Sequence, residues 1–312
     1  IAEQTDIPVM HDDQHGTAII SGAALLNAVE LQEKKLDKIK VVVIGAGASA
    51  IACANHYVAL GVERTNILMV DSKGIVTKKR LEAGELNEFK ETFAHDIEDG
   101  NLVDALAGAD VLLGLSKGGL VSKEMVSSMA KNPIIFACAN PDPEIKPELV
   151  DEVRPDAIVA TGRSDYPNQV NNLIGFPYIF RGALDVRSKT INEEMKVAAA
   201  HAIAQLAKED VPDEVVAAMG GDRPHYGKDY IIPSTFDPRL ISIIPSAVAK
   251  AAMESGVARK KIENFDIYQE QLKQRLDPTV TIMQGINGYI KKNQKKIVFA
   301  DGEDENTLKA AI

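Results

Sequence analysis

The stretch KVVVIGAGASAIACANHYVALGV, residues 40–62, decides the fold. A β-branched run over Val41–Ile44 predicts a strand, a glycine turn follows it, and the residues after the turn predict a helix that ends near Gly61. Further short apolar runs stand downstream, at residues 66–71, 109–115, 133–141 and 156–162. Such runs are typical of strands that are buried on both faces of a parallel sheet. Because helical stretches separate them, the sequence predicts an α/β fold: a doubly wound parallel sheet followed by helices.

The glycine turn has the dinucleotide pattern G-x-G-x-x-G/A between a strand and a helix, in the residues Gly45, Ala46, Gly47, Ala48, Ser49 and Ala50. The first glycine permits a tight turn, and the second lets backbone N–H groups approach a pyrophosphate at the positive end of the helix. The acid that should meet the ribose about 20 residues further on is Asp71, at the end of the next predicted strand. We therefore expect a Rossmann-type NAD(P) site; a glycine turn that binds no nucleotide is the alternative.

The residues after Asp71 leave the choice between NAD and NADP open. A lone carboxylate favours NAD, because it binds the ribose 2′-hydroxyl and repels a 2′-phosphate. However, Ser72, Lys73 and the basic run Lys78–Arg80 crowd the same edge and could hold a phosphate by charge-assisted hydrogen bonds. In the alternative interpretation, these basic residues only form a solvated face.

The composition argues against nucleic-acid and membrane partners. The net charge of −10 over 312 residues gives no basic surface for nucleic acid. No apolar run approaches the roughly 20 residues that cross a bilayer. Cys53 and Cys138 stand in apolar stretches without metal-ligand spacing, so we interpret them as buried thiols of a reducing cytoplasm.

A second motif, MHDDQHGTA at residues 10–18, places Asp12 and Asp13 directly before a long apolar helix predicted at 17–35. Acidic residues in this position can cap the helix. They can also hold a hard divalent cation such as Mg²⁺ or Mn²⁺, one as ligand and the other tuning a nearby catalytic group. Such a cation takes about six oxygen ligands, so the pair alone makes no complete site. The residues by themselves leave both interpretations open.

Longer motifs carry a family resemblance. HDDQHGTAIISGAALLNA, residues 11–28, is similar to the F-N-D-D-x-Q-G-T-A signature of malic enzymes. The likeness continues through VVVIGAGASA, VDSKGIV, FACANPDPE, ATGRSDYPNQVNN and FPYIFRGALDVR, roughly over residues 1–256. It implies the NAD(P)-binding domain of an enzyme that oxidatively decarboxylates malate to pyruvate with a divalent metal. The form VDSKG resembles that of the NADP-dependent members, so we expect NADP rather than NAD.

The resemblance assigns roles to individual residues. Asp13 resembles the metal-ligating aspartate, and Asp12 resembles its catalytic neighbour, which lies at the metal site and sets the pKa of the catalytic lysine. Asn140 resembles the asparagine between malate and the nicotinamide ribose, and Asn172, with Asn171 beside it, resembles the one that binds substrate. The alternatives are structural: Asn140 could shape a turn before a proline, and the asparagine pair could be ordinary loop residues.

Several other polar residues stand in or beside the predicted helices. Thr17 either contacts the cofactor or caps its helix. We expect His11 and His15 to support the metal site from behind its ligands or to make local hydrogen bonds, rather than to ligate metal. We expect His56 to be a packed or half-exposed helix residue.

Downstream of the sheet, two helix starts are marked in the sequence. Thr190 and Glu193 predict a capping box. Asp237 followed by Pro238 predicts the start of another helix, which Gly256 ends.

The resemblance also predicts the domain organisation. We expect residues 1–256 to form the NAD(P)-binding domain and 257–294 a helical connector. Residues 295–312 resemble the start of the phosphotransacetylase-like domain of bacterial hybrid malic enzymes. Because Ile1 is not a methionine and the last residues read as an unpaired strand, we expect a fragment of a longer polypeptide.

Two other functional classes are alternatives to the enzyme. One is a non-catalytic NAD(P)-binding regulatory module. The other is a different dehydrogenase of the same fold, which would need a histidine near Asn140 or Asn172, and none stands there in the sequence. In the malic enzyme family the lysine base, the tyrosine acid and a substrate-binding arginine lie upstream of this segment. We therefore expect this chain alone to bind dinucleotide without appreciable turnover, and its parent to be a homo-oligomer.

Overall fold

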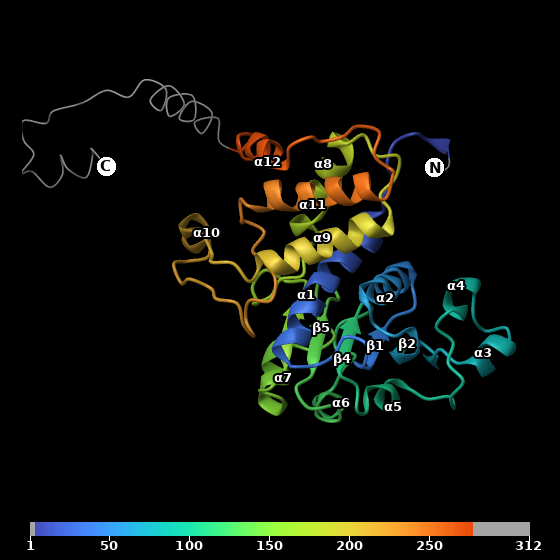
Figure 1. The fold of residues 1–312 in the computed structure, drawn as a ribbon. Coiled ribbons are helices and arrows are strands. Elements are labelled where there is room, and N and C mark those ends of the chain that lie inside the picture. The colour runs from blue at the N-terminus through green and yellow to red at the C-terminus, as the bar shows by residue number, and fades with distance from the viewer. Residues whose placement is uncertain (1–3, 277–312) are drawn as a thin grey trace, which may run out of the picture.

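A computed structural model describes residues 4–276, which form a sheet between two layers of helices (Figure 1). The strand order is β3-β2-β1-β4-β5-β6, and every pairing is parallel except β2 with β3. The strands are β1 (Val41–Ile44), β2 (Ile67–Asp71), β3 (Gly74–Ile75), β4 (Val111–Gly114), β5 (Ile134–Ala137) and β6 (Ile158–Thr161). The order reverses between β1 and β4, which is the switch point of a doubly wound sheet. The predicted fold class is confirmed.

Alternate residues of each strand enter different cores. Val41 and Val43 of β1 face the helices that precede and follow this strand, whereas Val42 and Ile44 face the opposite helix layer. All four residues are buried. Burying a side chain of this size contributes about 1.5–3 kcal/mol, so a strand without polar positions is stable only between two helix layers.

The two helix layers differ in thickness. The thinner layer consists of α5 (Leu102–Leu106), α6 (Lys123–Ser127) and α7 (Pro147–Val153). On the other face, α1 (Thr17–Leu31) and α2 (Ala48–Leu60) cover the sheet, and further helices form an outer layer beyond α1 (Figure 1). In this layer, α9 (Glu193–Leu206) packs on α1, and α11 (Leu240–Glu254) packs on α9. The helices α8 (Phe176–Asp185) and α12 (Phe265–Lys273) pack on α11.

Short helical segments connect the larger elements. They are η2 (Asp12–Gly16), η3 (Arg64–Asn66), α3 (Lys78–Glu82), α4 (Glu88–Glu91), η4 (Asn172–Ile174) and α10 (Asp213–Ala218). Of these, η2 matters most for the site, because it precedes α1 directly and contacts α2.

Some predicted boundaries were wrong. Helix α1 ends at Leu31 rather than near residue 35, because Glu33 takes a left-handed conformation (φ 54°) and the Lys34 N–H donates back to the Val29 carbonyl. The two-residue strand β3 was not predicted, since so short a strand leaves no hydrophobic period in the sequence.

The helix caps also differ from prediction. The N-cap of α9 is Asn192, whose side chain accepts the Met195 N–H at 3.1 Å, so the capping box of Thr190 and Glu193 is wrong. Asp237 accepts the Arg239 N–H in a turn, and α11 begins just after it. The end of α11 at Gly256, with φ 74°, is confirmed.

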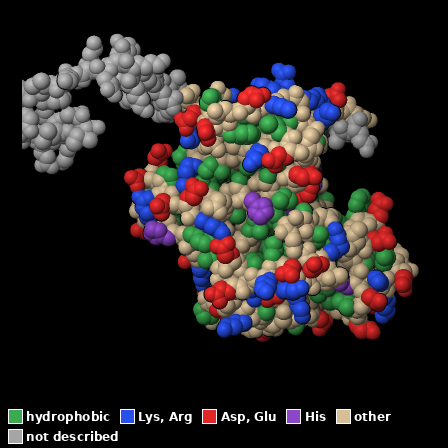
Figure 2. Space-filling view, viewed as in Figure 1, with side chains coloured by type: hydrophobic (Ala, Val, Ile, Leu, Met, Phe, Trp, Pro, Cys, Tyr) green, Lys and Arg blue, Asp and Glu red, His purple; other side chains and the backbone are tan. Residues whose placement is uncertain are grey.

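The domain boundaries at residues 256 and 294 remain predictions. The described part of the connector contains α12, which packs on α11, and residues 295–312 lie outside the described part of the chain. Acidic and basic side chains are interspersed over the face shown in Figure 2. Within residues 4–276, no helix is both long and apolar enough to span a membrane.

Candidate cofactor and metal site

The glycine turn lies between β1 and α2, as the dinucleotide pattern requires. Gly45 has φ 114°, and a Cβ atom there would lie 3.1 Å from the Leu115 carbonyl oxygen, so both backbone conformation and space demand glycine. Gly47 differs, because its φ is −86° and a Cβ would meet nothing within 4 Å. Space is therefore open at the second glycine, where a pyrophosphate would approach.

The N-terminus of α2 offers unpaired donors. Its N-cap is Gly47 and no side chain caps the helix. Gly47 and Ala48 are exposed, whereas Ala46 and Ser49 are half-buried and Ala50 is buried. The first N–H groups of a helix lack internal partners, and the helix dipole adds positive potential there. Residues 45–50 thus form an open cradle that suits a phosphate group.

Asp71 ends β2 at the same edge of the sheet, with both carboxylate oxygens occupied. It accepts the Lys73 N–H at 2.9 Å and forms ion pairs with Arg80 at 3.0 Å and Lys90 at 2.9 Å. Burial opposes ionisation, but the hydrogen bonds from Lys90 and Lys73 and the charges of Lys90 and Arg80 outweigh it and hold the pKa of Asp71 below its ordinary value. The carboxylate is therefore ionised and locally neutralised.

The basic residues near Asp71 divide into two groups. Arg80 is buried, pairs with Asp71 and also donates to the carbonyls of Gly74 and Ile75, so the alternative of a solvated face is wrong for this residue. Lys73 is exposed with its ammonium group 3.3 Å from Glu85, and Ser72 beside it is exposed. Exposed Lys78 and Lys79 pair with carboxylates that follow α4 in the chain, Asp96 at 4.0 Å and Asp99 at 2.9 Å.

The acidic motif forms a π-helical turn before α1, and Asn172 of η4 contacts this turn. The Asn172 amide group donates to both the backbone carbonyl and Oδ2 of Asp12, each at 3.2 Å. Thr17 Oγ1 lies 3.2 Å from the Asp13 carbonyl and 3.4 Å from Asn172 Oδ1. A Cβ on Gly16 would overlap Asp12 Oδ1, which explains the glycine. These site candidates therefore converge, although 160 residues separate Asp12 from Asn172.

The two carboxylates are available for a cation. Asp12 Oδ1 is buried and has no hydrogen-bond partner within residues 4–276. Asp13 is exposed, and its carboxylate likewise has no recorded partner in the described chain. The N-cap of α1 is Gly16 without a side-chain cap, so neither aspartate caps this helix.

This donor set suits a hard cation but does not complete a site. No group of at least three His, Cys, Asp or Glu side chains within residues 4–276 could hold a metal. Asp12 and Asp13 can supply only part of the roughly six oxygen ligands that Mg²⁺ or Mn²⁺ takes. The remaining ligands would have to come from substrate, water or other polypeptide.

The side chains of the other two predicted asparagines, Asn171 and Asn140, differ in their hydrogen bonding. Asn171 Oδ1 accepts the Leu173 N–H at 2.9 Å, so this side chain caps η4. Asn140 is exposed at the loop after β5, and its side chain has no recorded hydrogen bond in the described chain. It lines a cavity of about 580 Å³ between the loops that follow β4 and β5.

The comparisons with known proteins agree with these motifs. Residues 14–217 match the sequence model of a family described as "Malic enzyme, NAD binding domain". The chain belongs to the malic enzyme family. A malic enzyme from Pyrococcus horikoshii has a similar structure, with a TM-score of 0.77 and 35% identity, covering 93% of this chain and 64% of that one.

Malic enzymes with either cofactor are among the curated relatives. An NADP-dependent malic enzyme of Rhizobium meliloti is 56% identical over 312 residues, and an NAD-dependent malic enzyme of the same organism is 49% identical over 312 residues. Each alignment covers 100% of this chain but only 41% and 40% of the relative. The chain thus spans about 40% of the length of these malic enzymes.

A polar cluster joining three elements of this malic enzyme domain was not predicted. His15 Nδ1 lies 3.2 Å from Lys196 Nζ, and Lys196 lies 3.3 Å from Glu193. Glu193 also contacts Nδ1 of buried His56, on α2, at 2.7 Å. His15 contacts a lysine 181 residues away, so the expected local hydrogen bonding of this side chain is wrong. The packed position of His56 is confirmed, and His11 is exposed without a side-chain hydrogen bond in the described chain. Only the three-residue spacing of Glu193 and Lys196 hinted at this cluster.

The cysteines have structural roles. Cys53 is buried in α2 and Cys138 is half-buried after β5, and both are free thiols. Burial raises the pKa of Cys53 to about 12 and also raises that of Cys138. The predicted burial is therefore confirmed for Cys53 and partly for Cys138.

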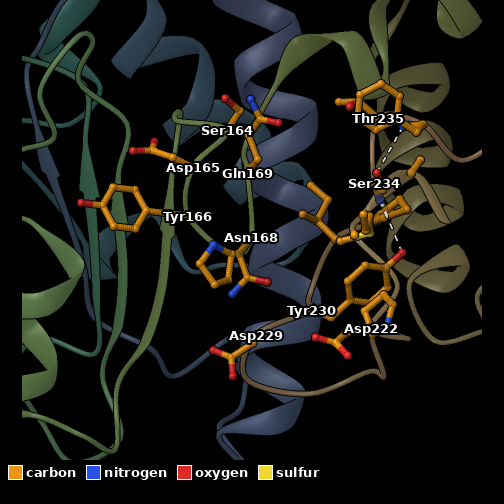
Figure 3. A pocket seen from close by; sticks show the side chains of 18 of the residues that line it. Ser164, Asp165, Tyr166, Asn168, Gln169, Asp222, Asp229, Tyr230, Ser234 and Thr235 are labelled. Carbon is orange, nitrogen blue, oxygen red and sulfur yellow. Dashed lines mark hydrogen bonds between the residues drawn. The ribbon is translucent and has the colours of Figure 1, made fainter. Parts of the chain in front are cut away.

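A second cavity within residues 4–276 contains none of the predicted site residues. It measures about 740 Å³ and lies between the loop after β6 and the segment around Tyr230 (Figure 3). Asn168 ties these walls together through the carbonyls of Val159 and Lys228. Ligands of open α/β sheets bind beyond the carboxyl ends of the strands at the switch point, so we take the cradle, rather than this cavity, as the cofactor site.

Proposed function

We propose that this chain is the dinucleotide-binding part of an enzyme that oxidatively decarboxylates malate to pyruvate and CO₂ with reduction of NAD(P). The carrying observation is the convergence of Asp12, Thr17 and Asn172 on a turn that packs against α2, the helix of the phosphate cradle. A binding module without chemistry would have no need of two adjacent carboxylates, one of them hydrogen-bonded to a substrate-type amide.

The residues of this chain would have separate roles in cofactor, substrate and metal binding. The cradle at residues 45–50 holds the pyrophosphate, and Asn140 and Asn172 orient malate so that its C2 hydride faces the nicotinamide. Asp13, with Asp12, would hold a divalent cation, which when bound polarises the 2-keto carbonyl and stabilises the enolate charge. Asp12 also orients Asn172 through the two hydrogen bonds of its amide group.

Proton transfer would depend on groups from outside this chain. The malate hydroxyl must lose a proton during oxidation, and C3 must gain one after CO₂ leaves. We assign the lysine base and the tyrosine acid of the family to the part of the parent that this chain does not span. The chain alone should therefore bind dinucleotide without turnover. We further propose that the parent is a cytoplasmic homo-oligomer.

We also propose NADP as the preferred cofactor. Asp71 already binds two cations, so it is a poor free acceptor for a ribose 2′-hydroxyl and repels a phosphate less than a lone carboxylate would. Exposed Ser72 and Lys73 follow at the same edge and can donate to a 2′-phosphate.

Substitution of Asp13 in the full-length parent tests the proposed function. Asp13→Asn should lower Mn²⁺-dependent malate turnover at least about 100-fold, because it removes an anionic ligand, while NADP affinity stays unchanged. Asp6→Asn, a change at a fully exposed carboxylate, is the matched control. Undiminished turnover of Asp13→Asn would exclude the metal role, and loss of NADP binding would point to misfolding instead.

A further inference from the structure

Glu144 is a buried carboxylate at the carboxyl edge of the sheet. It is 0% exposed, and no ion pair to it occurs within residues 4–276. Its Oε1 accepts the Ser116 N–H and its Oε2 the Ala139 N–H, each at 3.0 Å. Burial raises the pKa of Glu144, and these backbone donors offset part of that rise. A buried carboxylate without a cation is costly, so its position calls for an explanation.

The hydrogen bonds of Glu144 join two loops. Ser116 belongs to the loop after β4, and Ala139 directly precedes Asn140 in the loop after β5. The backbones are joined as well, because the Val121 N–H donates to the Glu144 carbonyl and the Gly119 N–H to the Pro143 carbonyl, each at 3.0 Å. Glu144 therefore holds the Asn140 loop against its neighbour.

Two glycines show how closely these loops approach. A Cβ on Gly114 would overlap the Glu144 carboxyl group, and a Cβ on Gly118 would lie 2.7 Å from the Asp142 carbonyl oxygen. Neither glycine has a left-handed φ. Both are thus explained by the contact between the loops rather than by backbone conformation.

The contact extends to the phosphate cradle. The Leu115 N–H donates to the Ile44 carbonyl at 3.0 Å, and the Leu115 carbonyl oxygen would lie 3.1 Å from a Cβ atom on Gly45. Packed backbone therefore runs from the glycine turn through Leu115 and Ser116 to Glu144, and from there to Asn140.

We propose that Glu144 is a positioning residue that fixes Asn140 toward the nicotinamide half of the cofactor. The inference rests on the proposed function, since it takes the cradle to hold a dinucleotide. A dinucleotide bound at the switch point lies with one half toward β2 and the other toward β4 and β5. Asp71 marks the adenosine side, so the loops joined by Glu144 serve the nicotinamide side.

Two ligands separate the halves of the site. The wild-type chain and Glu144→Gln are titrated calorimetrically with NADP and with 2′,5′-ADP, which lacks the nicotinamide half. Glutamine keeps the volume but has one acceptor oxygen, so its amide group would face one of the two backbone N–H donors. We expect NADP affinity to fall about tenfold and 2′,5′-ADP affinity to remain within about twofold.

A second variant and a control complete the test. Gly118→Ala pushes against the Asp142 carbonyl oxygen in the loop that carries Asn140. It should likewise lower NADP affinity while leaving 2′,5′-ADP affinity nearly unchanged. Asn27→Ala removes two buried hydrogen bonds, to the Ala204 and Ile231 carbonyls, and should lower Tm without changing either affinity.

The possible results lead to different conclusions. If Glu144→Gln is unfolded at room temperature, the NADP and 2′,5′-ADP affinities of Gly118→Ala test the positioning role instead. Unchanged NADP binding by the folded variants, or equal loss of both ligands, would overturn the positioning role. If the wild-type chain binds neither ligand, the proposed function fails, and this inference fails with it.

Discussion

At the scale of single residues, substitutions of Gly45 and Gly47 should affect different properties, the first stability and the second cofactor binding. Gly45→Ala should lower the free energy of unfolding by about 1–3 kcal/mol, because alanine is strained at φ 114° and crowds the Leu115 carbonyl. Gly47→Ala should leave unfolding within about 0.5 kcal/mol, since space is open there, yet weaken NADP binding by blocking the pyrophosphate. Urea unfolding and calorimetry on both variants measure these effects. Tight NADP binding by Gly47→Ala would show that the cradle is placed wrongly.

Lys90 is the residue on which cofactor choice depends in this account. Lys90→Gln removes the 2.9 Å ion pair and leaves Asp71 with more uncompensated charge. NADP affinity should fall about three- to tenfold, with NAD affinity changing less, because only the 2′-phosphate is repelled. Lys78→Gln is the control, since this exposed lysine is 4.0 Å from its nearest carboxylate. Equal effects on both cofactors would remove Asp71 from the account of selectivity.

At the scale of elements, Glu193 joins α9 to α2 through His56. Burial opposes its ionisation, but the hydrogen bond from His56 and the Lys196 charge outweigh this and lower the pKa of Glu193 to about 2. A carboxyl group whose folded pKa lies below its unfolded value stabilises the protein above the unfolded pKa. That contribution is lost as the pH falls from the ordinary 4.5 toward 2.

The pH dependence of Tm tests this joint. Between about pH 5 and pH 2.5, Tm should fall less steeply for Glu193→Gln than for the wild type, because the variant has no carboxyl group to protonate. Glu194→Gln, at an exposed neighbour without an ion pair in the described chain, should retain the wild-type slope. Parallel curves for all three proteins would mean that the contact with His56 contributes nothing to stability.

At the scale of the whole molecule, the sheet was predictable because each strand carries its own signal. A continuous apolar run such as 111–114 identifies a doubly covered strand without knowledge of its neighbours. The glycine turn and Asp71 followed from spacing for the same reason. By contrast, Lys90 of α4 contacts Asp71 at the end of β2, and no local sequence pattern marks that pair.

The acidic site was only partly predictable. From the residues alone, Asp12 and Asp13 could have been helix caps, and only the resemblance to malic enzymes linked them to Asn172. The hydrogen bonds between Asn172 and Asp12 depend on the tertiary fold, since α1, α2 and η4 must first pack together. Glu144 stayed hidden, because a single glutamate after a proline-rich turn has no sequence signature.

Calorimetric titration of the 312-residue chain with NADP and NAD, each with and without Mn²⁺, tests the central claim most directly. We expect micromolar NADP binding, clearly weaker NAD binding and little effect of the metal, because the cradle is complete and the carboxylate site is not. If neither dinucleotide binds to a chain that melts cooperatively, the cradle is not a cofactor site and the account is contradicted.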